Sequence, residues 1–420
     1  MAYRAPGVYV EEVDSAVQPI TGAGTSTAAF IGVSADISGK WDPNLRTGMP
    51  VDLDDKAYTQ AEALKPQPVN SWTEFTQKFG DIQEDNLFLA LAAYGFFTNG
   101  GTRCWVTRIE PVEEPGKEYD QLTADVRTAL NRYESIDEIS IVAAPLPRDV
   151  PQEVLNQVHD ELRNHCQTME DRVAILDSAC EIKDDNLVIT NGPAGIWKPP
   201  ADKKGYASFY FPWIRVVDPL QGGGELIAVP PSGHLAGVYA RNDSERGVHK
   251  APANEIILGA LDLEYHVSKE LQNTLNPDGV NCIRSFSGTI KVYGARTLAS
   301  HTGGQGADEW KYVSVRRLVN YLRRSIDAGT QWVVFEPNAP DLWSKIRRNV
   351  GAFLNGEWAA GALIGATPEQ AFYVRCDETT NPPEVRNRGE VVTEIGVAVV
   401  RPAEFVIFRL SQWAGAGEAQ

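Results

Sequence analysis

The sequence predicts a mixed α/β (α+β) protein with more than one domain and with a strand at each end of the chain. Three observations support this prediction. The chain has 420 residues, more than one compact core usually holds, and 43% of them are hydrophobic. Its middle alternates short apolar runs with amphipathic stretches at helical spacing. Both ends are rich in β-branched and aromatic residues, which favour strands.

The first half of the chain alternates predicted strands and helices. After an N-terminal strand at 7–13, the small polar residues 15–27 predict a flexible arm or loop. A buried strand is expected at 28–34, further strands at 104–109, 139–144 and 173–177, and helices at 71–79, 86–97, 122–133 and 151–169. Ser71 and Glu74 have the spacing of a capping box, and Gly80 is a typical helix end.

The second half begins with irregular sequence and ends in a compact α+β unit. Residues 181–205 predict an insertion or long loop, 209–217 an aromatic strand interrupted by Pro212, and 228–254 a loop. Helices are expected at about 313–327 and 342–359. Strands are expected at 280–284, 289–292, 332–335, 371–376, 391–400 and 405–410.

The two terminal strands suggest contact with other chains. A strand at a terminus has unpaired N–H and C=O groups along one edge, and terminal residues fray unless something holds them. Each strand therefore either closes a sheet in its own domain or pairs with another chain. Two such ends on one chain favour a subunit that is linked to its neighbours.

Composition narrows the function classes. The net charge of −17 argues against general nucleic-acid binding. Five dispersed cysteines without a C-x-x-C pair indicate reduced thiols and folding in a cytoplasm. The N-terminus lacks a signal-peptide pattern, and the apolar run 87–97 is far shorter than a membrane span. We expect a soluble protein without membrane insertion.

No residue pattern predicts catalysis, a cofactor or a metal. The segment 32–40 has six residues before Gly-Lys, where a phosphate-binding loop needs four. His159 and His165 are six residues apart on one predicted helix, which does not put them on one face, and no third ligand is evident. His234 and Arg241 are expected to order a loop. We therefore expect no enzyme activity.

A basic segment stands out in this acidic chain. Residues 311–350 hold eight Lys and Arg against three acidic residues. In the first predicted helix, Arg317 and Arg324 lie opposite the apolar face. In the second predicted helix, Arg348 lies opposite the apolar face and is flanked by Lys345 and Arg347. These residues form either a solvated polar face or a surface for an acidic partner.

Several long motifs, in order, resemble contractile tail sheath proteins. The N-terminal Pro6-Gly-Val-Tyr-Val-Glu-Glu12 is similar to the start of that family. The strongest resemblance lies in Pro230–Asp243 and Gly247–Asn254. Further matches are Gly279–Arg284, Val292–Leu298, Trp332–Asn338, Leu342–Val350 and Tyr373–Pro382. The matches include both ends and all of 229–413, whereas 100–228 is less distinctive.

The resemblance implies a conserved inner sheath domain built from both chain ends, with an inserted outer α/β domain. We assign 1–26 to an N-terminal arm, 27–250 to the outer domain, 251–400 to the inner domain and 401–420 to a C-terminal arm. In the family, both arms pair with strands of neighbouring subunits. The corresponding arm residues are Val8, Tyr9, Val10, Glu11, Glu12, Phe405, Val406, Ile407, Phe408, Arg409 and Leu410. The receiving residues are Tyr373, Val374, Arg375, Val397, Ala398 and Val399.

The resemblance also implies a function and partners. The subunit would polymerise as a helical lattice of stacked, hexameric rings around an inner tube, and would contract to drive the tube through a target envelope. Its partners would be further copies of itself, the tube, and baseplate and terminator or cap proteins, without direct nucleic acid. The acidic tube would meet Arg317, Arg324, Lys345, Arg347 and Arg348. Assembly would occur in a bacterial cytoplasm, in a phage tail or a releasable injection particle.

Two alternatives stay open from the sequence. One is a cytosolic α/β enzyme whose site is formed by residues distant in the chain, which would give a discrete small oligomer with a ligand-binding cleft. The other is a non-contractile tail or baseplate structural protein of similar domain composition.

Overall fold

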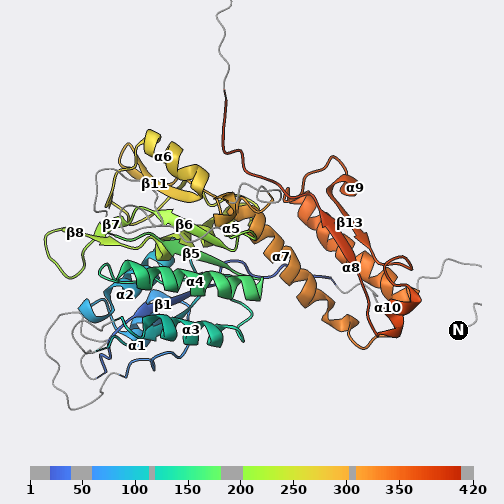
Figure 1. Ribbon diagram of the computed structural model, residues 1–420, viewed down its shortest axis with the longest axis horizontal. Helices are drawn as coiled ribbons and strands as arrows, with labels where there is room; N and C mark the ends of the chain where they lie inside the picture. Colours follow the sequence, from blue (N-terminus) through green and yellow to red (C-terminus); the bar gives the residue numbers. More distant parts are fainter. Residues whose placement is uncertain (1–18, 39–58, 113–118, 181–201, 302–308, 408–420) are drawn as a thin grey trace, which may run out of the picture.

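The chain folds into a large lobe built on a nine-stranded sheet and a small lobe built on two long helices (Figure 1). The computed structural model describes residues 19–38, 59–112, 119–180, 202–301 and 309–407. We define the large lobe as residues 28–301 and the small lobe as residues 313–400. None of the helices in the described ranges is long and apolar enough to cross a membrane.

The nine-stranded sheet has the order β2-β3-β1-β4-β5-β6-β11-β12-β9. Its centre, from β3 to β11, is parallel, and antiparallel strands close both edges. Parallel strands are covered on both faces, which explains why they read as continuous apolar runs. The strands are β1 (Ala28–Val33), β2 (Gln67–Val69), β3 (Cys104–Ile109), β4 (Ile141–Ala143), β5 (Val173–Asp177), β6 (Ala207–Phe211), β9 (Glu255–Ile256), β11 (Val280–Phe286) and β12 (Thr289–Val292).

Helices cover both faces of this sheet and bury two separate cores. Strand β1 illustrates the alternation, because Ala28 and Phe30 face one core while Ala29 and Ile31 face the other. The first core is covered by α1 (Trp72–Phe79), α2 (Leu87–Thr98) and α5 (Ser232–Arg246). The second is covered by α3 (Leu122–Tyr133), α4 (Gln152–Met169) and α6 (Lys269–Leu275). Short 3-10 turns are η1 (Glu84–Asn86), η2 (Asn276–Asp278) and η3 (Leu298–His301).

A small antiparallel sheet adjoins the large one. Its order is β10-β7-β8, formed by β7 (Ile214–Val217), β8 (Leu226–Val229) and β10 (Asp262–Leu263). Val216 and Val229 from this sheet enter the first core. The small sheet is therefore part of the large lobe.

The small lobe packs a two-stranded ribbon against two long helices. The helices are α7 (Val313–Thr330) and α8 (Pro340–Ala359), joined through η4 (Gln331–Val333). The ribbon pairs β13 (Phe372–Arg375) with β14 (Glu394–Val397), and the short helices α9 (Pro368–Ala371) and α10 (Pro383–Asn387) flank β13. Leu318, Leu322, Ile346, Val350 and Leu354 form the core between the helices, as their spacing predicts.

Most predicted elements are confirmed, including the mixed α/β class. The strands at 104–109, 173–177 and 289–292 and the helix at 122–133 have the predicted bounds. Ser71 caps α1, because its hydroxyl accepts a hydrogen bond from the Glu74 N–H at 3.1 Å. Gly80 follows the last residue of α1 with φ +85°.

The prediction of a loop at 228–254 is wrong, because β8 and α5 occupy much of that range. The glycines that suggest a loop allow α5 to approach α2 closely instead. A Cβ on Gly233 would lie 2.4 Å from Ala92 Cα, and a Cβ on Gly237 would lie 2.4 Å from the Phe96 carbonyl oxygen. Arg241 donates to the carbonyl oxygens of Asn99 and Ile256 at 3.1 and 2.6 Å, so it binds neighbouring elements from a helix.

Three further expectations change. Residues 332–335 form no strand, since η4 covers 331–333 and Phe335 has φ +69°. The predicted strand at 405–410 has no strand pairing in its described part, 405–407. Finally, the domain boundary expected after residue 250 falls inside the large lobe, because β9, β11 and β12 complete its sheet. Strand pairing across the sheet, and not sequence order, fixes that boundary.

Candidate assembly surfaces

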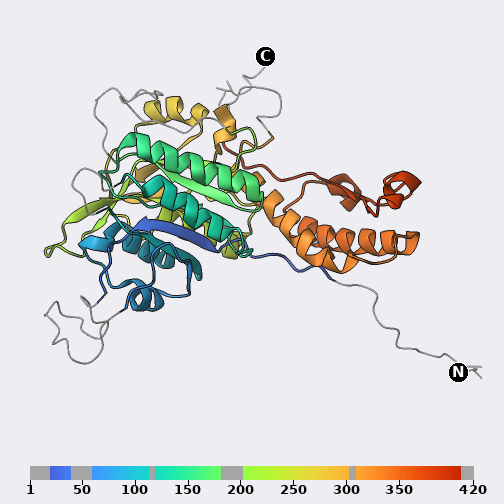
Figure 2. The same ribbon diagram turned by 60° about the horizontal axis from the view of Figure 1, so that its bottom comes forward.

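The described end of the N-terminal segment packs along α7 and joins the two lobes. Ile20 is only 9% exposed and belongs to the small-lobe core. The Ala23 N–H donates to Ser325 Oγ at 2.9 Å. Figure 2 shows this blue segment running from β1 toward the small lobe. Residues 19–27 are therefore a packed segment and not the flexible arm predicted for 15–27, while Val8–Glu12 lie outside the described residues.

A buried ion pair holds this segment at the junction of the lobes. Arg317 on α7 donates to both Asp243 oxygens on α5, at 2.8 and 2.5 Å, and to the Thr25 carbonyl oxygen at 3.0 Å. Thr25 Oγ1 donates to Asp243 at 2.6 Å. Burial by itself lowers the pKa of Arg317, but the Asp243 carboxylate outweighs it and raises the pKa. The pair is thus charged, and it links α7, α5 and the N-terminal segment.

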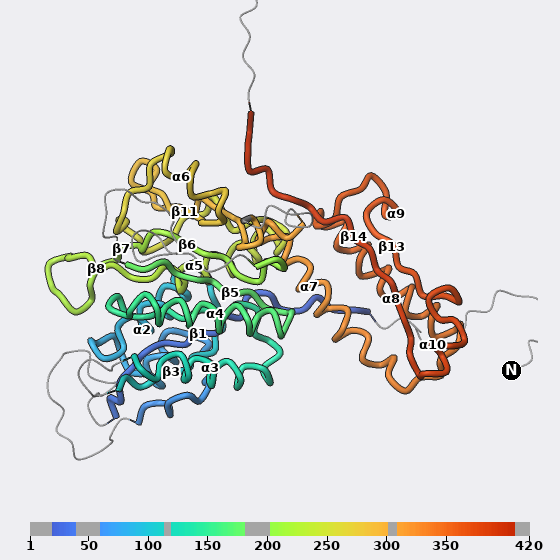
Figure 3. Tube along the Cα trace, viewed as in Figure 1, coloured from blue at the N-terminus to red at the C-terminus, as the bar shows by residue number. Residues whose placement is uncertain are grey.

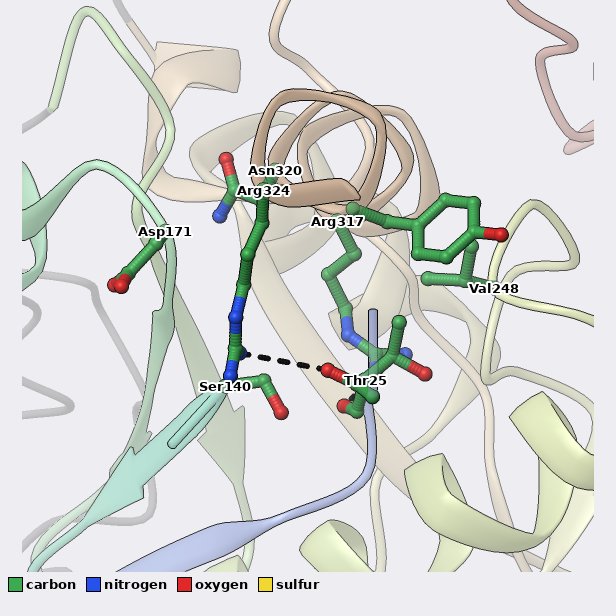
Figure 4. Close-up of a pocket in the computed structure, with 9 residues that line it drawn as sticks. Thr25, Ser140, Asp171, Val248, Arg317, Asn320 and Arg324 are labelled. Atoms are coloured by element: carbon green, nitrogen blue, oxygen red, sulfur yellow. Dashed lines mark hydrogen bonds between the residues drawn. The ribbon is translucent and has the colours of Figure 1, made fainter. Parts of the chain in front are cut away.

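Figure 4 shows Arg317 and Arg324 extending from α7 toward the segment that carries Thr25. Arg324 is half-buried and donates to the carbonyl oxygens of Gly24 and Ile139, each at 3.4 Å. A small pocket lies between these side chains and Ser140. Its lining comes from both lobes and from the N-terminal segment, so the pocket marks where these three parts meet.

The predicted role of Arg317 as a tube contact is wrong for this structure. Arg317 is only 4% exposed. Its neighbour Arg316 is also buried, with its guanidinium carbon 3.4 Å from the Trp310 ring centroid, and burial lowers its pKa. Arg323 is exposed and forms an ion pair with Glu170. Helical spacing places Arg317 opposite the apolar face, but in the structure the large lobe covers much of that side of α7.

The basic residues of α8 are less buried than Arg317. Arg348 is exposed and Lys345 is half-buried, and neither forms an ion pair within the described part of the chain. Arg347 is half-buried and donates to the Cys376 carbonyl oxygen and to Ser344 Oγ. Among the predicted tube contacts, the structure therefore leaves Arg348 on α8 exposed, whereas Arg317 on α7 is buried.

The predicted receiving strands form the two-stranded ribbon of the small lobe. Tyr373 pairs with Gly396, Val374 with Ile395 and Phe372 with Val397, all antiparallel. The ribbon continues past β14, where the Ala398 N–H donates to the Ala371 carbonyl oxygen at 2.8 Å and Val399 bridges Leu363. Tyr373 is 49% exposed and Arg375 is also exposed. In the described ranges this sheet has only two strands, which leaves strand edges open to an added strand.

The C-terminal segment leaves the ribbon and returns to the large lobe (Figure 3). There, Glu404 accepts hydrogen bonds from Arg296 at 2.7 and 2.8 Å, from Asn276 at 2.8 Å and from Tyr312 at 3.0 Å. Partial burial raises the pKa of Glu404, but the hydrogen bonds from Arg296 and Asn276 outweigh it and lower the pKa. The carboxylate thus stays charged and fixes the chain at residue 404.

The next residues are apolar and exposed. Phe405, Val406 and Ile407 are 68%, 70% and 78% exposed. Figure 3 shows this segment turning away from both lobes. Phe408, Arg409 and Leu410 lie outside the described residues. Three consecutive apolar side chains of this kind rarely stay exposed to water.

Two titratable groups buried in the large lobe have strongly shifted pKa values. Asp177 accepts a hydrogen bond from the Ser232 N–H at 2.8 Å, and burial raises the pKa of Asp177 to about 7. Burial lowers the pKa of the nearby His159 to about 3. These groups lie inside the core without access to solvent. In the described ranges no group of three or more His, Cys, Asp or Glu residues is arranged to hold a metal.

Two family models together match nearly all residues from 136 to 412. The phage tail sheath protein central domain matches residues 136–298, and the phage tail sheath C-terminal domain matches residues 306–412. Their order and spacing agree with the resemblance in the motifs. The chain belongs to the contractile tail sheath family. The gap between the two models coincides with the boundary between the lobes.

Known sheath proteins resemble the chain in sequence and fold. The tail sheath protein of Vibrio phage KVP40 is 29% identical over 184 residues, or 43% of this chain. That match covers 25% of the phage protein, so this sheath protein spans about a quarter of that relative.

Solved structures resemble it over nearly its full length. The anti-feeding prophage helical sheath in its contracted state has a TM-score of 0.71 and 26% identity, covering 98% of this chain and 100% of that chain. The sheath complex of the extracellular contractile injection system PVC, also contracted, has a TM-score of 0.69 and 25% identity, covering 99% of both chains.

The sequence did not reveal the residues that fix the arms. It did not predict the contact of Thr25 with Asp243 near the N-terminal segment. It also did not predict the contact of Glu404 with Arg296 near the C-terminal segment. Asp243 and Arg296 lie inside or next to family motifs, which was the only signal. Nothing in the local spacing indicates partners 74 or 108 residues away.

Proposed function

We propose that this protein is the structural subunit of a contractile sheath, which polymerises as a helical lattice around an inner tube and contracts to drive the tube through a target envelope. One observation carries the proposal: a single chain has both an exposed apolar segment at 405–407 and an open two-stranded ribbon at β13–β14. The resemblance to contracted sheath subunits of injection systems supports it. The lattice consists of stacked, hexameric rings.

The arms link neighbouring copies by adding strands to the ribbon. Phe405–Leu410 from one neighbour and Val8–Glu12 from another pair with the open edges near Tyr373–Arg375 and Val397–Val399. Main-chain hydrogen bonds then provide affinity, and alternate side chains fix the register. The open edges of the isolated chain support this assignment, because unpaired edges are usually covered in a stable monomer.

The tube is held by the basic face of α8. Lys345, Arg347 and Arg348 supply the contact, and Arg324 contributes at most from the rim because it is half-buried. Each exposed ion pair is weak and sensitive to salt. Many such contacts hold an acidic tube in the extended state and still break during contraction.

Baseplate and terminator or cap proteins bound the two ends of the polymer. A structural match in the baseplate of the anti-feeding prophage, with a TM-score of 0.71, supports a baseplate-proximal position for some copies. Assembly takes place in a bacterial cytoplasm, within a phage tail or a particle that is later released. The sheath protein itself needs no cofactor and no contact with nucleic acid.

Negative-stain electron microscopy of the protein expressed alone tests this function. We expect long, striated, hollow tubes, which are sheaths assembled without a tube. Adding the cognate tube protein should give filled particles of a longer pitch. A uniform small oligomer in both preparations contradicts the proposal and favours the enzyme alternative.

A further inference from the structure

The C-terminal arm could add a strand to either of two ribbons. One is the ribbon of a second copy, and the other is the β13–β14 ribbon of its own small lobe. The ribbon continues to Val400, whose N–H donates to the Ala362 carbonyl oxygen, so only residues 401–404 separate it from Phe405. Loops of two to five residues suffice to connect antiparallel strands. The chain is therefore long enough for the arm to fold back.

Pairing of the arm with its own ribbon would be favoured over pairing with a second copy, because the two strands are tethered to each other. A short tether gives its own partner an effective concentration in the millimolar range. A second copy at micromolar concentration cannot compete with this unless something prevents the intramolecular pairing. In the structure, 405–407 point away from the ribbon (Figure 3).

The contact that fixes this direction is the cluster around Glu404. Arg296 is 6% exposed and binds both Glu404 oxygens, while its Nη1 also donates to the Asn276 carbonyl oxygen at 2.9 Å. Tyr312, at the start of α7, donates a further hydrogen bond to Glu404. All of these partners lie outside the ribbon, so the cluster holds residue 404 on the large-lobe side.

We propose that Glu404 is a clasp that keeps the C-terminal arm off the ribbon of its own chain and so reserves it for a second copy. This inference rests on the proposed function, because it assumes that the arm pairs with a ribbon. Bidentate arginine–carboxylate pairs are both strong and directional, which suits a group that must fix an exit direction. Glu404 acts as a positioning residue and does not enter the interface between subunits.

Two variants of the full-length chain test the clasp. Glu404→Gln keeps the size of the side chain and removes its charge. Arg296→Lys keeps the positive charge and removes the bidentate geometry. We expect each variant to yield at least about tenfold less polymer by sedimentation and electron microscopy. We also expect the 405–407 amides of the monomer to become protected from hydrogen exchange, because the arm then pairs with its own ribbon.

Glu161→Gln is the matched control. Glu161 accepts a bidentate pair from Arg127 at 3.0 and 2.6 Å on the surface of the large lobe, far in sequence from either arm. This variant should polymerise normally. Thermal unfolding of each monomer shows whether the variant is folded before its polymer is measured.

Two results would overturn the clasp. One is polymer formation at the wild-type level by both variants. The other is a lower polymer yield from folded monomers whose 405–407 amides exchange as fast as in the wild type. Failure of the wild-type chain to polymerise would instead count against the proposed function, and the exchange measurement on monomers would still test the clasp.

Discussion

The helices α7 and α8 share a pattern of apolar and basic residues, but their arginines have different surroundings. Both are long, both have one apolar face, and both carry arginines away from that face. On α7, Arg316 and Arg317 are each 4% exposed and bind aromatic rings or Asp243. On α8, Arg348 is exposed without an ion pair in the described part of the chain. The same residue type therefore stabilises the junction of the lobes in one helix and remains available to a partner in the other.

The strongest test of this comparison removes one arginine from each helix. Arg317→Met leaves the Asp243 carboxylate buried without its partner, and we expect the free energy of unfolding to fall by about 3 to 5 kcal/mol. Arg348→Met should change it by less than about 0.5 kcal/mol. Urea denaturation of the monomers measures both. If both substitutions lowered the free energy of unfolding equally, Arg317 would not be compensating a buried carboxylate at Asp243.

A second test uses pH, because the two lobes differ in histidine content. His159, His165 and His234 are buried in the large lobe, and the sequence has no histidine after residue 301. Burial lowers the pKa of His234 to about 4, so the folded state binds fewer protons than the unfolded chain below pH 6.5. The contribution of neutral His234 to the free energy of unfolding is therefore present above about pH 6.5 and is lost as the pH falls toward 4.

We expect this effect of His234 to reach about 2 to 3 kcal/mol near pH 4. Asp177 acts in the opposite direction, since its pKa is raised to about 7 and its contribution is lost as the pH rises through that value. Urea denaturation at several pH values should show His234→Gln with a flatter acid limb than the wild type, and Asp177→Asn with a steeper one. Parallel curves for all three proteins would contradict the assignment.

A third test makes one substitution in each lobe. A Cβ at Gly237 on α5 would lie 2.4 Å from the Phe96 carbonyl oxygen, whereas at Gly351 on α8 it would meet no atom within 4 Å. Gly237→Ala should destabilise the monomer by about 1 to 3 kcal/mol through overpacking. Gly351→Ala should stabilise it by about 0.5 to 1 kcal/mol, because alanine restricts the unfolded chain. Thermal unfolding measures both, and a Gly237→Ala variant at least as stable as the wild type would refute the close α2–α5 contact.

Charge reversal on α8 is expected to have the smallest effect on stability and a large effect on assembly. The double variant Lys345→Glu with Arg348→Glu should change the free energy of unfolding by less than about 0.5 kcal/mol. Sheaths of this variant should form without tubes, and raising the salt concentration should weaken tube binding by the wild type. Electron microscopy and co-sedimentation with the tube protein provide the measurement. Normally filled particles would exclude α8 as the tube contact.

Local sequence predicted most of the elements, because their causes are local. Alternation and apolar runs identified β1, β3 and β5, and helical spacing identified α3, α7 and α8. The prediction of a loop at 228–254 is wrong because α5 lies in this range, where Gly233 and Gly237 allow close contact with α2. The predicted strand at 332–335 failed because high strand propensity alone does not provide a partner strand.

The sequence by itself determined most of the secondary structure, the α/β class and the family, since periodicity, capping and ordered motifs depend on neighbouring residues. Only the tertiary structure decided which charged side chains are exposed and which ones bind the N- and C-terminal segments. Arg317 meets Asp243 and Thr25, and Arg296 meets Glu404, across 74 to 292 residues of chain. Burial depends on what packs against a residue, and no local pattern contains that information.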